Sequence, residues 1–408
     1  MAAVKPEAFE VPLLTDVLSK DGKKTHEFTI PKRCITDPDD MPKLPCKLWF
    51  VRFGAFVLGV REALTGKGRS APHPVSPVAQ TLISKLDEAR AWIALIPPAK
   101  QAQRFGNVAF REWRAKLATC AVGWMREIVD ASGKFPAGFA LSGPEVPPSA
   151  LAIAGVQGLH AADNAPLLAE AVYKFAPGTA ASDAPLPCSA AAELAGYFVE
   201  SFGNAGRIDY GTGHEMTFVV FLTALVVLGV CTREDYPALA CDVFDAYLRT
   251  ARELQRAYWL EPAGSKGAWG LDDYQFLPFL WGSAQLSAND RFPTPSAAAR
   301  VVEDPAQGAL GGAEAAEGEF LLVDAARFVC SVKTGPLAVH SPYMASMLEV
   351  PSWDRVVNGL VVMYGKEILT KFPIMQHTLF GSLMPWTDVE ASEQTVGIAV
   401  RFGLVSNE

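Results

Sequence analysis

The chain has 408 residues, half of them hydrophobic, and its formal net charge at pH 7 is −8. This length can form a large core, either in one domain with subdomains or in two or three packed units. The negative net charge argues against a nucleic-acid-binding protein, whose affinity depends on basic side chains near phosphates. The basic pairs at residues 23–24 and 32–33 are too short to indicate binding to a membrane surface.

The cysteines and the N-terminus indicate the compartment. Seven cysteines are scattered along the chain without a CxxC pair, which predicts reduced thiols and neither a disulfide framework nor a zinc site. The first residues contain no apolar run of the kind found in a secretory signal. We therefore expect a cytoplasmic protein, and a nuclear location is left open.

Apolar residues recur at helical spacing through most of the chain, which predicts an all-α fold with many helices. The apolar run at residues 216–231 is about one turn too short for a bilayer span and predicts a buried central helix. An amphipathic pattern starts at Tyr236 and continues for several turns. In chain order, the predicted helices lie at residues 81–96, 216–231, from 236 onward, 320–332 and 353–364.

Three stretches rich in Gly, Pro, Ala or Ser interrupt this pattern. Residues 66–77 predict a loop, and residues 131–189 and 289–319 predict loop insertions. No internal repeat divides the chain. We expect one all-α domain over residues 1–408, with subdomains.

Residues 207–215 read RIDYGTGHE and directly precede the apolar run. Gly211 and Gly213 allow a tight turn and close approach of a ligand, and the start of a helix offers free N–H groups to an anion. Arg207 can add a fork of donors for a phosphate. The same residues also fit a capping box at the start of a helix, with Thr212 as the cap and Glu215 three residues later. The two interpretations are compatible.

Residues 261–282 form the second informative segment. Asp272 and Asp273 could offer oxygens to a magnesium ion held partly by a nucleotide, or could cap the next helix. Aromatic residues cluster in the same segment, which is typical of a core; if exposed, they would form an apolar groove for proline-containing peptides. These aromatic residues are Trp269, Tyr274, Phe276, Phe279 and Trp281.

Several familiar catalytic motifs are absent from the sequence. His214-Glu215 is followed by Phe218, so the second histidine of a zinc-protease helix is missing. The sequence contains no GxSxG elbow, kinase loop set or GxxxxGK[ST] loop. No residue can be named from the sequence as a catalytic acid or base.

Taken together, these segments resemble the phosphotyrosyl activators of protein phosphatase 2A, the activator and peptidyl-prolyl isomerase family. The resemblance covers most of the chain outside the three loop stretches. The motifs that carry it are FTIPK at residues 28–32, RFGN at 104–107 with Trp113, GN at 203–204, RIDYGTGHE at 207–215, residues 261–286, KTGP at 333–336, VPSW at 350–353, KFP at 371–373, QH at 376–377 and FGSL at 380–383.

The resemblance implies an all-α fold with core, lid and linker subdomains around a cleft. It implies an activator and folding factor of the type 2A phosphatase catalytic subunit, with prolyl isomerase activity. The expected cofactors are ATP and magnesium, bound chiefly in complex with that subunit. By resemblance, the nucleotide residues are Arg207, Thr212, Gly213, Pro373, Gln376 and His377, the magnesium residues are Gly267 (through its carbonyl) and Asp273, and the groove residues are Trp269, Tyr274, Phe276 and Trp281.

The sequence departs from the family pattern at a few positions. Ala205 and Gly206 are smaller than the usual polar pair, Val339 replaces an acidic residue, and residues 342–347 diverge. These changes affect the approach to Arg207 and one patch of the expected partner surface. The alternative function is a non-enzymatic peptide-binding chaperone of the phosphatase, whose isomerase activity is incidental. An independent ATPase is a weaker alternative because the P-loop is missing.

Overall fold

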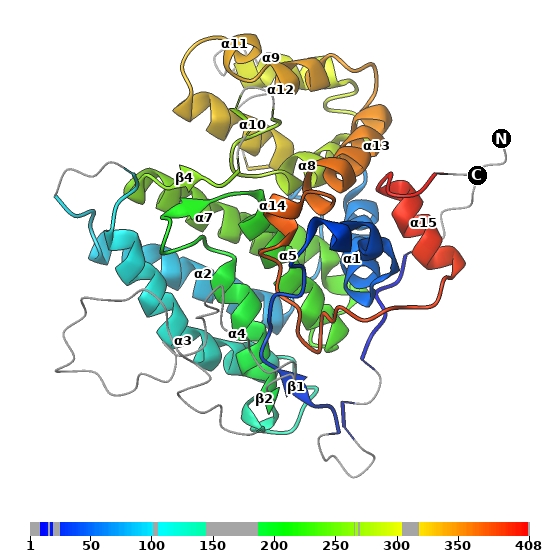
Figure 1. The fold of residues 1–408 in the computed structure, drawn as a ribbon. Helices are drawn as coiled ribbons and strands as arrows, with labels where there is room; N and C mark the ends of the chain where they lie inside the picture. The colour runs from blue at the N-terminus through cyan, green and yellow to red at the C-terminus, as the bar shows by residue number, and fades with distance from the viewer. Residues whose placement is uncertain are drawn as a thin grey trace.

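The computed structural model describes residues 9–14, 17–18, 25–100, 105–143, 187–264, 266–267, 270–303 and 318–406. Helices dominate this part of the chain, and its strands form two sheets of two strands each (Figure 1). The predicted all-α fold class is therefore confirmed. Among the described residues, no helix combines the length and the apolar character needed to cross a membrane.

The elements follow one another in a simple order along the chain. The α-helices are α1 (Leu48–Leu64), α2 (Pro77–Leu95), α3 (Ala109–Ala131), α4 (Ala190–Glu200), α5 (Thr212–Val227), α6 (Tyr236–Ala238), α7 (Phe244–Tyr258), α8 (Leu277–Leu286), α9 (Pro295–Glu303), α10 (Leu321–Val332), α11 (Leu337–His340), α12 (Pro342–Leu348), α13 (Trp353–Tyr364), α14 (Phe372–Met375) and α15 (Glu393–Arg401). Two π-helical turns, η5 (Leu239–Val243) and η8 (Gly365–Leu369), follow α6 and α13.

The short strands join distant parts of the chain. β1 (Phe28–Thr29) pairs antiparallel with β2 (Pro187–Cys188). β3 (Asp209–Tyr210) pairs in parallel with β4 (Glu261–Pro262). The second pair matters for function because it places the start of α5 beside the loop that follows β4.

Helix α5 lies at the centre of the core. From Glu215 to Val227 every residue of α5 is buried, and the helix packs against α1, α4 and α14. The apolar run at residues 216–231 is therefore a buried helix, as predicted. The helix ends at Val227, four residues earlier than the run, because Gly229 adopts a positive φ of 80° that continues no helix.

The other predicted helices occur with small changes in their bounds. The predicted helix at residues 81–96 is α2, which starts earlier, at Pro77, because the Ser76 side chain caps it. The pattern from Tyr236 forms α6, η5 and α7 without a break. The predicted helices at 320–332 and 353–364 are α10 and α13. Within the expected loop at 289–319, residues 295–303 instead form helix α9.

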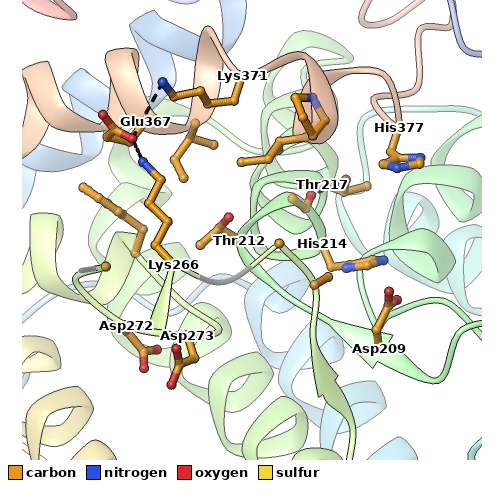
Figure 2. Close-up of a pocket in the computed structure, with 18 of the residues that line it drawn as sticks. Asp209, Thr212, His214, Thr217, Lys266, Asp272, Asp273, Glu367, Lys371 and His377 are labelled. Carbon is orange, nitrogen blue, oxygen red and sulfur yellow. Dashed lines mark hydrogen bonds and ion pairs between the residues drawn. The ribbon is translucent and has the colours of Figure 1, made fainter. Parts of the chain in front are cut away.

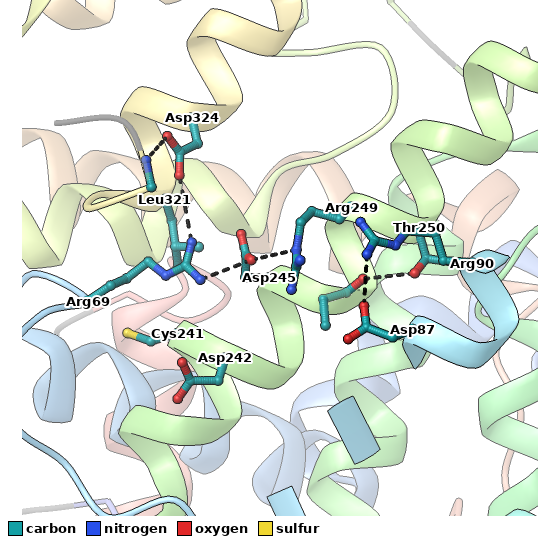
Figure 3. Close-up of polar contacts among 12 residues, drawn as sticks. Arg69, Asp87, Arg90, Cys241, Asp242, Asp245, Arg249, Thr250, Leu321 and Asp324 are labelled. Atoms are coloured by element: carbon teal, nitrogen blue, oxygen red, sulfur yellow. Dashed lines mark hydrogen bonds and ion pairs between the residues drawn. The ribbon is translucent and has the colours of Figure 1, made fainter. Parts of the chain in front are cut away.

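Residues 144–186 and 304–317 lie outside the described part of the chain, so most of the two predicted insertions cannot be compared with it. The loop expected at residues 66–77 forms no helix or strand before α2 begins. Polar contacts hold this loop against two helices (Figure 3). Arg69 pairs with Asp245 of α7 at 3.0 Å and with Asp324 of α10 at 3.9 Å.

Helices α9 to α12 form a separate layer at the top of Figure 1, above α8 and α13. Its closest attachment to the rest of the chain is the packing of α10 on α8. Gly282 of α8 makes this contact possible, because a Cβ at this position would collide with the backbone of Leu322. We call α9 to α12 the lid layer.

Candidate functional site

A cavity of about 420 Å³ lies at the N-terminal end of α5. Its walls come from the start of α5, the loop after β4, the loop before α8, and the η8–α14 segment (Figure 2). The lining residues are far apart in the chain, from Arg33 near the N-terminus to His377 near the C-terminus. The cavity therefore gathers the two informative sequence segments and the C-terminal motif into one place.

The start of α5 forms one wall. Thr212 and Gly213 line the cavity, as the resemblance implies. The N-cap of α5 is Gly211, and Thr212 is already the first helical residue, so the capping-box interpretation was wrong. Glu215 has a different partner: its Oε2 accepts the backbone N–H groups of Phe276 at 2.8 Å and Leu277 at 3.1 Å. The backbone N–H groups of His214 and Glu215 donate to the Gly211 carbonyl at 2.9 and 3.2 Å, so Thr212 and Gly213 are the residues whose N–H groups begin α5 at the cavity.

Glu215 is a buried carboxyl group that joins the starts of α5 and α8. Burial raises its pKa to about 8, although the two backbone donors lower it. The neighbouring carboxyl of Asp272 adds to the rise and the Arg252 guanidinium opposes it. Protonation of this one group is therefore coupled to how two helices are held together near the cavity.

Arg207 lies at the rim of the cavity, and its side chain is 48% exposed. Its Nε donates to Asp209 Oδ2 at 2.5 Å, and its backbone N–H donates to Asn204 Oδ1 at 2.9 Å. The Asp209 carboxylate fixes the guanidinium and offsets part of its charge. The remaining donors of Arg207 can still reach an anion in the cavity.

His214 follows Gly213 in the cavity wall, and the sequence analysis did not assign it to the site. Its Nδ1 is buried and has no hydrogen-bond partner among the residues that the structure describes. Burial, with the nearby Arg207 charge as a second cause, lowers the pKa of His214 to about 3. The ring is therefore neutral at pH 7 and stacks on Tyr210 with a centroid distance of 5.8 Å. His214 therefore contributes a neutral ring, and no charge, to the cavity wall.

Two lysines and a glutamate form the opposite wall (Figure 2). Lys266 forms an ion pair with Glu367, and Lys371 lies 3.9 Å from the same carboxylate. The sequence analysis missed these residues as well. Two features of the sequence could have indicated them: Lys266 lies inside a glycine-rich loop, and Lys371 comes directly before Phe372-Pro373.

The two adjacent aspartates have different roles. Asp272 is half-buried, and its Oδ2 accepts the backbone N–H groups of Tyr274 at 3.4 Å and Gln275 at 2.9 Å, so it caps the turn before α8. Asp273 instead pairs with Lys333 at 2.6 Å. Both carboxylates line the cavity, but only that of Asp273 has a cation as its partner at this distance.

Gly267 has a positive φ of 54°, and its carbonyl accepts the N–H of Gly270 at 3.0 Å. Among the described residues, it is not part of the cavity wall. A carbonyl oxygen has two lone pairs, so a second partner is chemically allowed. Of the two expected magnesium residues, Asp273 therefore lies in the cavity and Gly267 lies near its edge.

The C-terminal motif supplies the last wall. Pro373 and His377 line the cavity, whereas Gln376 lies at the end of α14 and its Nε2 donates to the Pro373 carbonyl at 3.4 Å. Loss of water around the ring, followed by the charges of Arg33 and Arg207, lowers the pKa of His377 to about 4. Five of the six expected nucleotide residues thus line one cavity.

The expected aromatic groove needs a correction. Trp281 is fully buried in α8, where its Nε1 donates to the Val57 carbonyl at 3.2 Å and its ring packs edge-on against Phe244. It is a core residue, because the inner face of α8 faces α1 and α7. Phe276 lines the cavity although only 3% of it is exposed. Tyr274 is partly buried and donates to the Leu260 carbonyl. Trp269 lies outside the described residues.

The cavity carries nearly balanced charge. Four basic and five acidic side chains line it: Arg33, Arg207, Lys266 and Lys371, with Glu200, Asp209, Asp272, Asp273 and Glu367. In the described part of the chain, no group of three or more His, Cys, Asp or Glu side chains could hold a metal by itself. Magnesium is usually held by one or two carboxylates together with substrate phosphates. Asp273 lies in the same cavity as the first residues of α5, which suits a magnesium ion held together with phosphates.

The comparison with protein families identifies the chain. The model of the Phosphotyrosyl phosphate activator (PTPA) protein family matches residues 31–386. The chain belongs to this family. The cavity described above lies entirely within the matched residues.

Similar proteins carry names that agree with the family. The chain is 35% identical to "Serine/threonine-protein phosphatase 2A activator 2" of Cryptococcus neoformans over 82% of this chain and 71% of that protein. It is 31% identical to activator 1 of Schizosaccharomyces pombe, over 90% of this chain and 94% of the other. A crystal structure of the PP2A phosphatase activator Ypa1 PTPA1 has the same fold, with a TM-score of 0.65, 24% identity, and coverage of 89% of this chain and 96% of that one.

Proposed function

We propose that this protein activates the catalytic subunit of a type 2A serine/threonine phosphatase, and that its cavity binds ATP with magnesium at the face that the subunit contacts. Membership of the activator family and the names of the relatives support the activator role. The observation that carries the nucleotide part is the gathering of Arg207, Thr212, Gly213, Pro373 and His377 in one cavity.

The geometry supports a nucleotide with a bound cation rather than a bare anion. The N–H groups at the start of α5 and the Arg207 guanidinium suit phosphate oxygens. Asp273 and the other acidic side chains would repel a triphosphate unless a divalent cation lay between them. Magnesium, when bound, would neutralise phosphate charge, and the carboxylate of Asp273 would hold it against the loop before α8.

Prolyl isomerase activity is the second part of the proposal and comes from the family resemblance. The barrier to rotation about a prolyl bond is about 18–20 kcal/mol because of amide resonance. A site can lower it by binding a twisted amide and excluding water, without a covalent catalyst. Of the expected groove residues, Phe276 lines the cavity with 3% of it exposed, and Tyr274 is partly buried against the core. The alternative is a peptide-binding chaperone whose isomerase activity is incidental.

The decisive assay measures recovery of activity by an inactive type 2A catalytic subunit incubated with the full chain, ATP and magnesium. Asp273→Asn should lower the recovery, because it removes the carboxylate proposed to hold magnesium. Asp388→Asn is the matched control: Asp388 also pairs with a lysine, Lys47 at 2.7 Å, but is 77% exposed and does not line the cavity. No recovery with the unmodified chain would reject the activator role, and equal recovery with Asp273→Asn would reject the magnesium role.

A second assay separates the isomerase from the binding chaperone. Isomerisation of a proline peptide is measured with the chain alone, with the catalytic subunit added, and with ATP turnover followed in parallel. Isomerisation that depends on the chain supports the enzyme. Binding of the peptide without a change in isomerisation rate supports the chaperone, and ATP hydrolysis by the chain alone would support an independent ATPase.

A further inference from the structure

The ion pair between Asp273 and Lys333 joins two separate parts of the fold. Asp273 lies in the loop before α8 and lines the cavity, whereas Lys333 is the C-cap residue that directly follows α10. The two charged groups are 2.6 Å apart, and their side chains are 16% and 24% exposed. Lys333 is not among the described residues that line the cavity, so its ammonium group reaches the carboxylate from the lid side.

An ammonium group already occupies the environment that a divalent cation would need. A positive charge within hydrogen-bond distance reduces the negative potential of the Asp273 carboxylate and repels a second cation nearby. The effect is only partly screened, because both side chains are mostly buried. The nearby Asp272 carboxylate differs, because its Oδ2 already accepts the backbone N–H groups of Tyr274 and Gln275 and has a capping role.

We propose that Lys333 competes with magnesium for Asp273 and so lowers the affinity of the cavity for the cation-bound nucleotide. The inference rests on the proposed nucleotide function of the cavity. Cation binding would then release Lys333 from the loop before α8. Lys333 lies two residues before Gly335, whose φ of 99° marks the turn from α10 to α11. Occupation of the cavity would in this way loosen a contact between the core and the lid layer of α9 to α12.

The test compares the affinity of the full chain for ATP with and without magnesium by calorimetry. The ratio of the two affinities measures the contribution of the cation. Lys333→Met should raise this ratio about fivefold, the effect expected from removing a partly exposed ion pair. Lys333→Arg keeps the positive charge and should leave the ratio near that of the unmodified chain. Lys43→Met is the matched control, because Lys43 pairs with Asp40 at 2.9 Å away from the cavity.

The outcomes separate the inference from the function on which it rests. If the unmodified chain binds ATP with a magnesium-dependent gain that Asp273→Asn removes, the magnesium role stands. A Lys333→Met ratio that is unchanged or lower then overturns the competition and means that Lys333 positions Asp273 for the cation. If the unmodified chain shows no magnesium-dependent gain, the proposed function fails and the inference fails with it.

Hydrogen exchange gives a readout that is independent of affinity. Magnesium and ATP should speed exchange at residues 333–340 of the unmodified chain, because the ion pair opens. In Lys333→Met these amides should already exchange at the faster rate, with no further change on addition of the ligands. Slower exchange on ligand addition in the unmodified chain would contradict release of Lys333. A melting temperature for Lys333→Met close to that of Lys43→Met would establish that the variant is folded.

Discussion

Arg207 has two partners to satisfy, an aspartate within the protein and the proposed phosphate in the cavity. The Asp209 carboxylate holds the guanidinium at the rim, at 2.5 Å, while almost half of the side chain stays exposed. An ion pair this exposed contributes about 0–1 kcal/mol to stability. The contribution of Arg207 to phosphate binding should be larger, because charge-assisted hydrogen bonds contribute about 1.5–3 kcal/mol.

Arg207→Ala should therefore weaken magnesium–ATP binding about tenfold to a hundredfold, with little change in melting temperature. Calorimetry and thermal unfolding measure the two effects. Arg249→Ala is the control, because Arg249 is 43% exposed and pairs with Asp245 at 2.9 Å outside the cavity. A large drop in melting temperature with normal ATP affinity would assign Arg207 a structural role instead.

At the scale of elements, Glu215 connects the first turn of α5 with the start of α8. The pKa of Glu215 is about 8 in the folded chain and 4.5 ordinarily. Between pH 4.5 and pH 8, the carboxyl of Glu215 is therefore protonated in the folded state and ionised in the unfolded state. The stabilisation is complete below pH 4.5 and disappears as the pH rises through about 8. The loss is at most about 1.4 kcal/mol per pH unit within this window.

Glu215→Gln should remove this dependence, because glutamine does not titrate and can still accept the two N–H groups. The free energy of unfolding is measured with urea from pH 5 to 9 for both chains. We expect the variant to gain stability relative to the unmodified chain as the pH rises. Glu261→Gln, a change at an exposed glutamate of β4, should leave the slope unchanged. Parallel pH profiles for Glu215→Gln and the unmodified chain would contradict the shifted pKa.

Helix α8 depends on its core contacts, which gives a second prediction at this scale. Trp281→Ala should cost about 3–5 kcal/mol of unfolding free energy, because the ring is fully buried and the change leaves a cavity. Trp259, which is 59% exposed, provides the control, and Trp259→Ala should cost much less. Urea unfolding measures both. If Trp281→Ala lowered the unfolding free energy only slightly and weakened peptide binding, Trp281 would be a groove residue.

At the scale of the whole molecule, the cavity has nearly equal numbers of basic and acidic side chains and a partly exposed rim. Its own charges therefore give little net attraction to a triphosphate, and tight binding needs positive charge from another surface. We expect the phosphatase catalytic subunit to supply that surface. Binding of the nucleotide and of the subunit should then be coupled, and the coupling must be equal in both directions.

Magnesium–ATP should thus bind weakly to the chain alone and more tightly to its complex with the catalytic subunit. Calorimetry measures the nucleotide affinity in both states, and a separate titration measures the affinity of the chain for the subunit with and without the nucleotide. The two ratios should agree. Equal nucleotide affinity in the presence and absence of the subunit would contradict a shared site.

The sequence by itself determined the five helical segments whose apolar residues recur at helical spacing, whereas α3, α4 and α9 were not among its predictions. The apolar stripe from Trp353 to Tyr364 predicted α13 to the residue, because its spacing is a local property of the chain. The motifs at residues 207–215, 261–286 and 371–377 together supplied most of the cavity wall. Periodicity was sufficient for α13 because the helix depends on neighbours within a few turns, whereas the motif at residues 371–377 was assigned to the site only through the family resemblance.

Only the tertiary structure decided how those residues are used. Glu215 looked like a helix cap, yet its partners are the N–H groups of Phe276 and Leu277, about sixty residues away. Trp281 belongs to the core because of what α8 packs against, and periodicity specifies an apolar face without specifying its neighbour. Asp273 has Lys333 as its partner because the lid layer brings α10 to the edge of the cavity. Contacts between distant segments depend on the packing of whole helices, which no local pattern records.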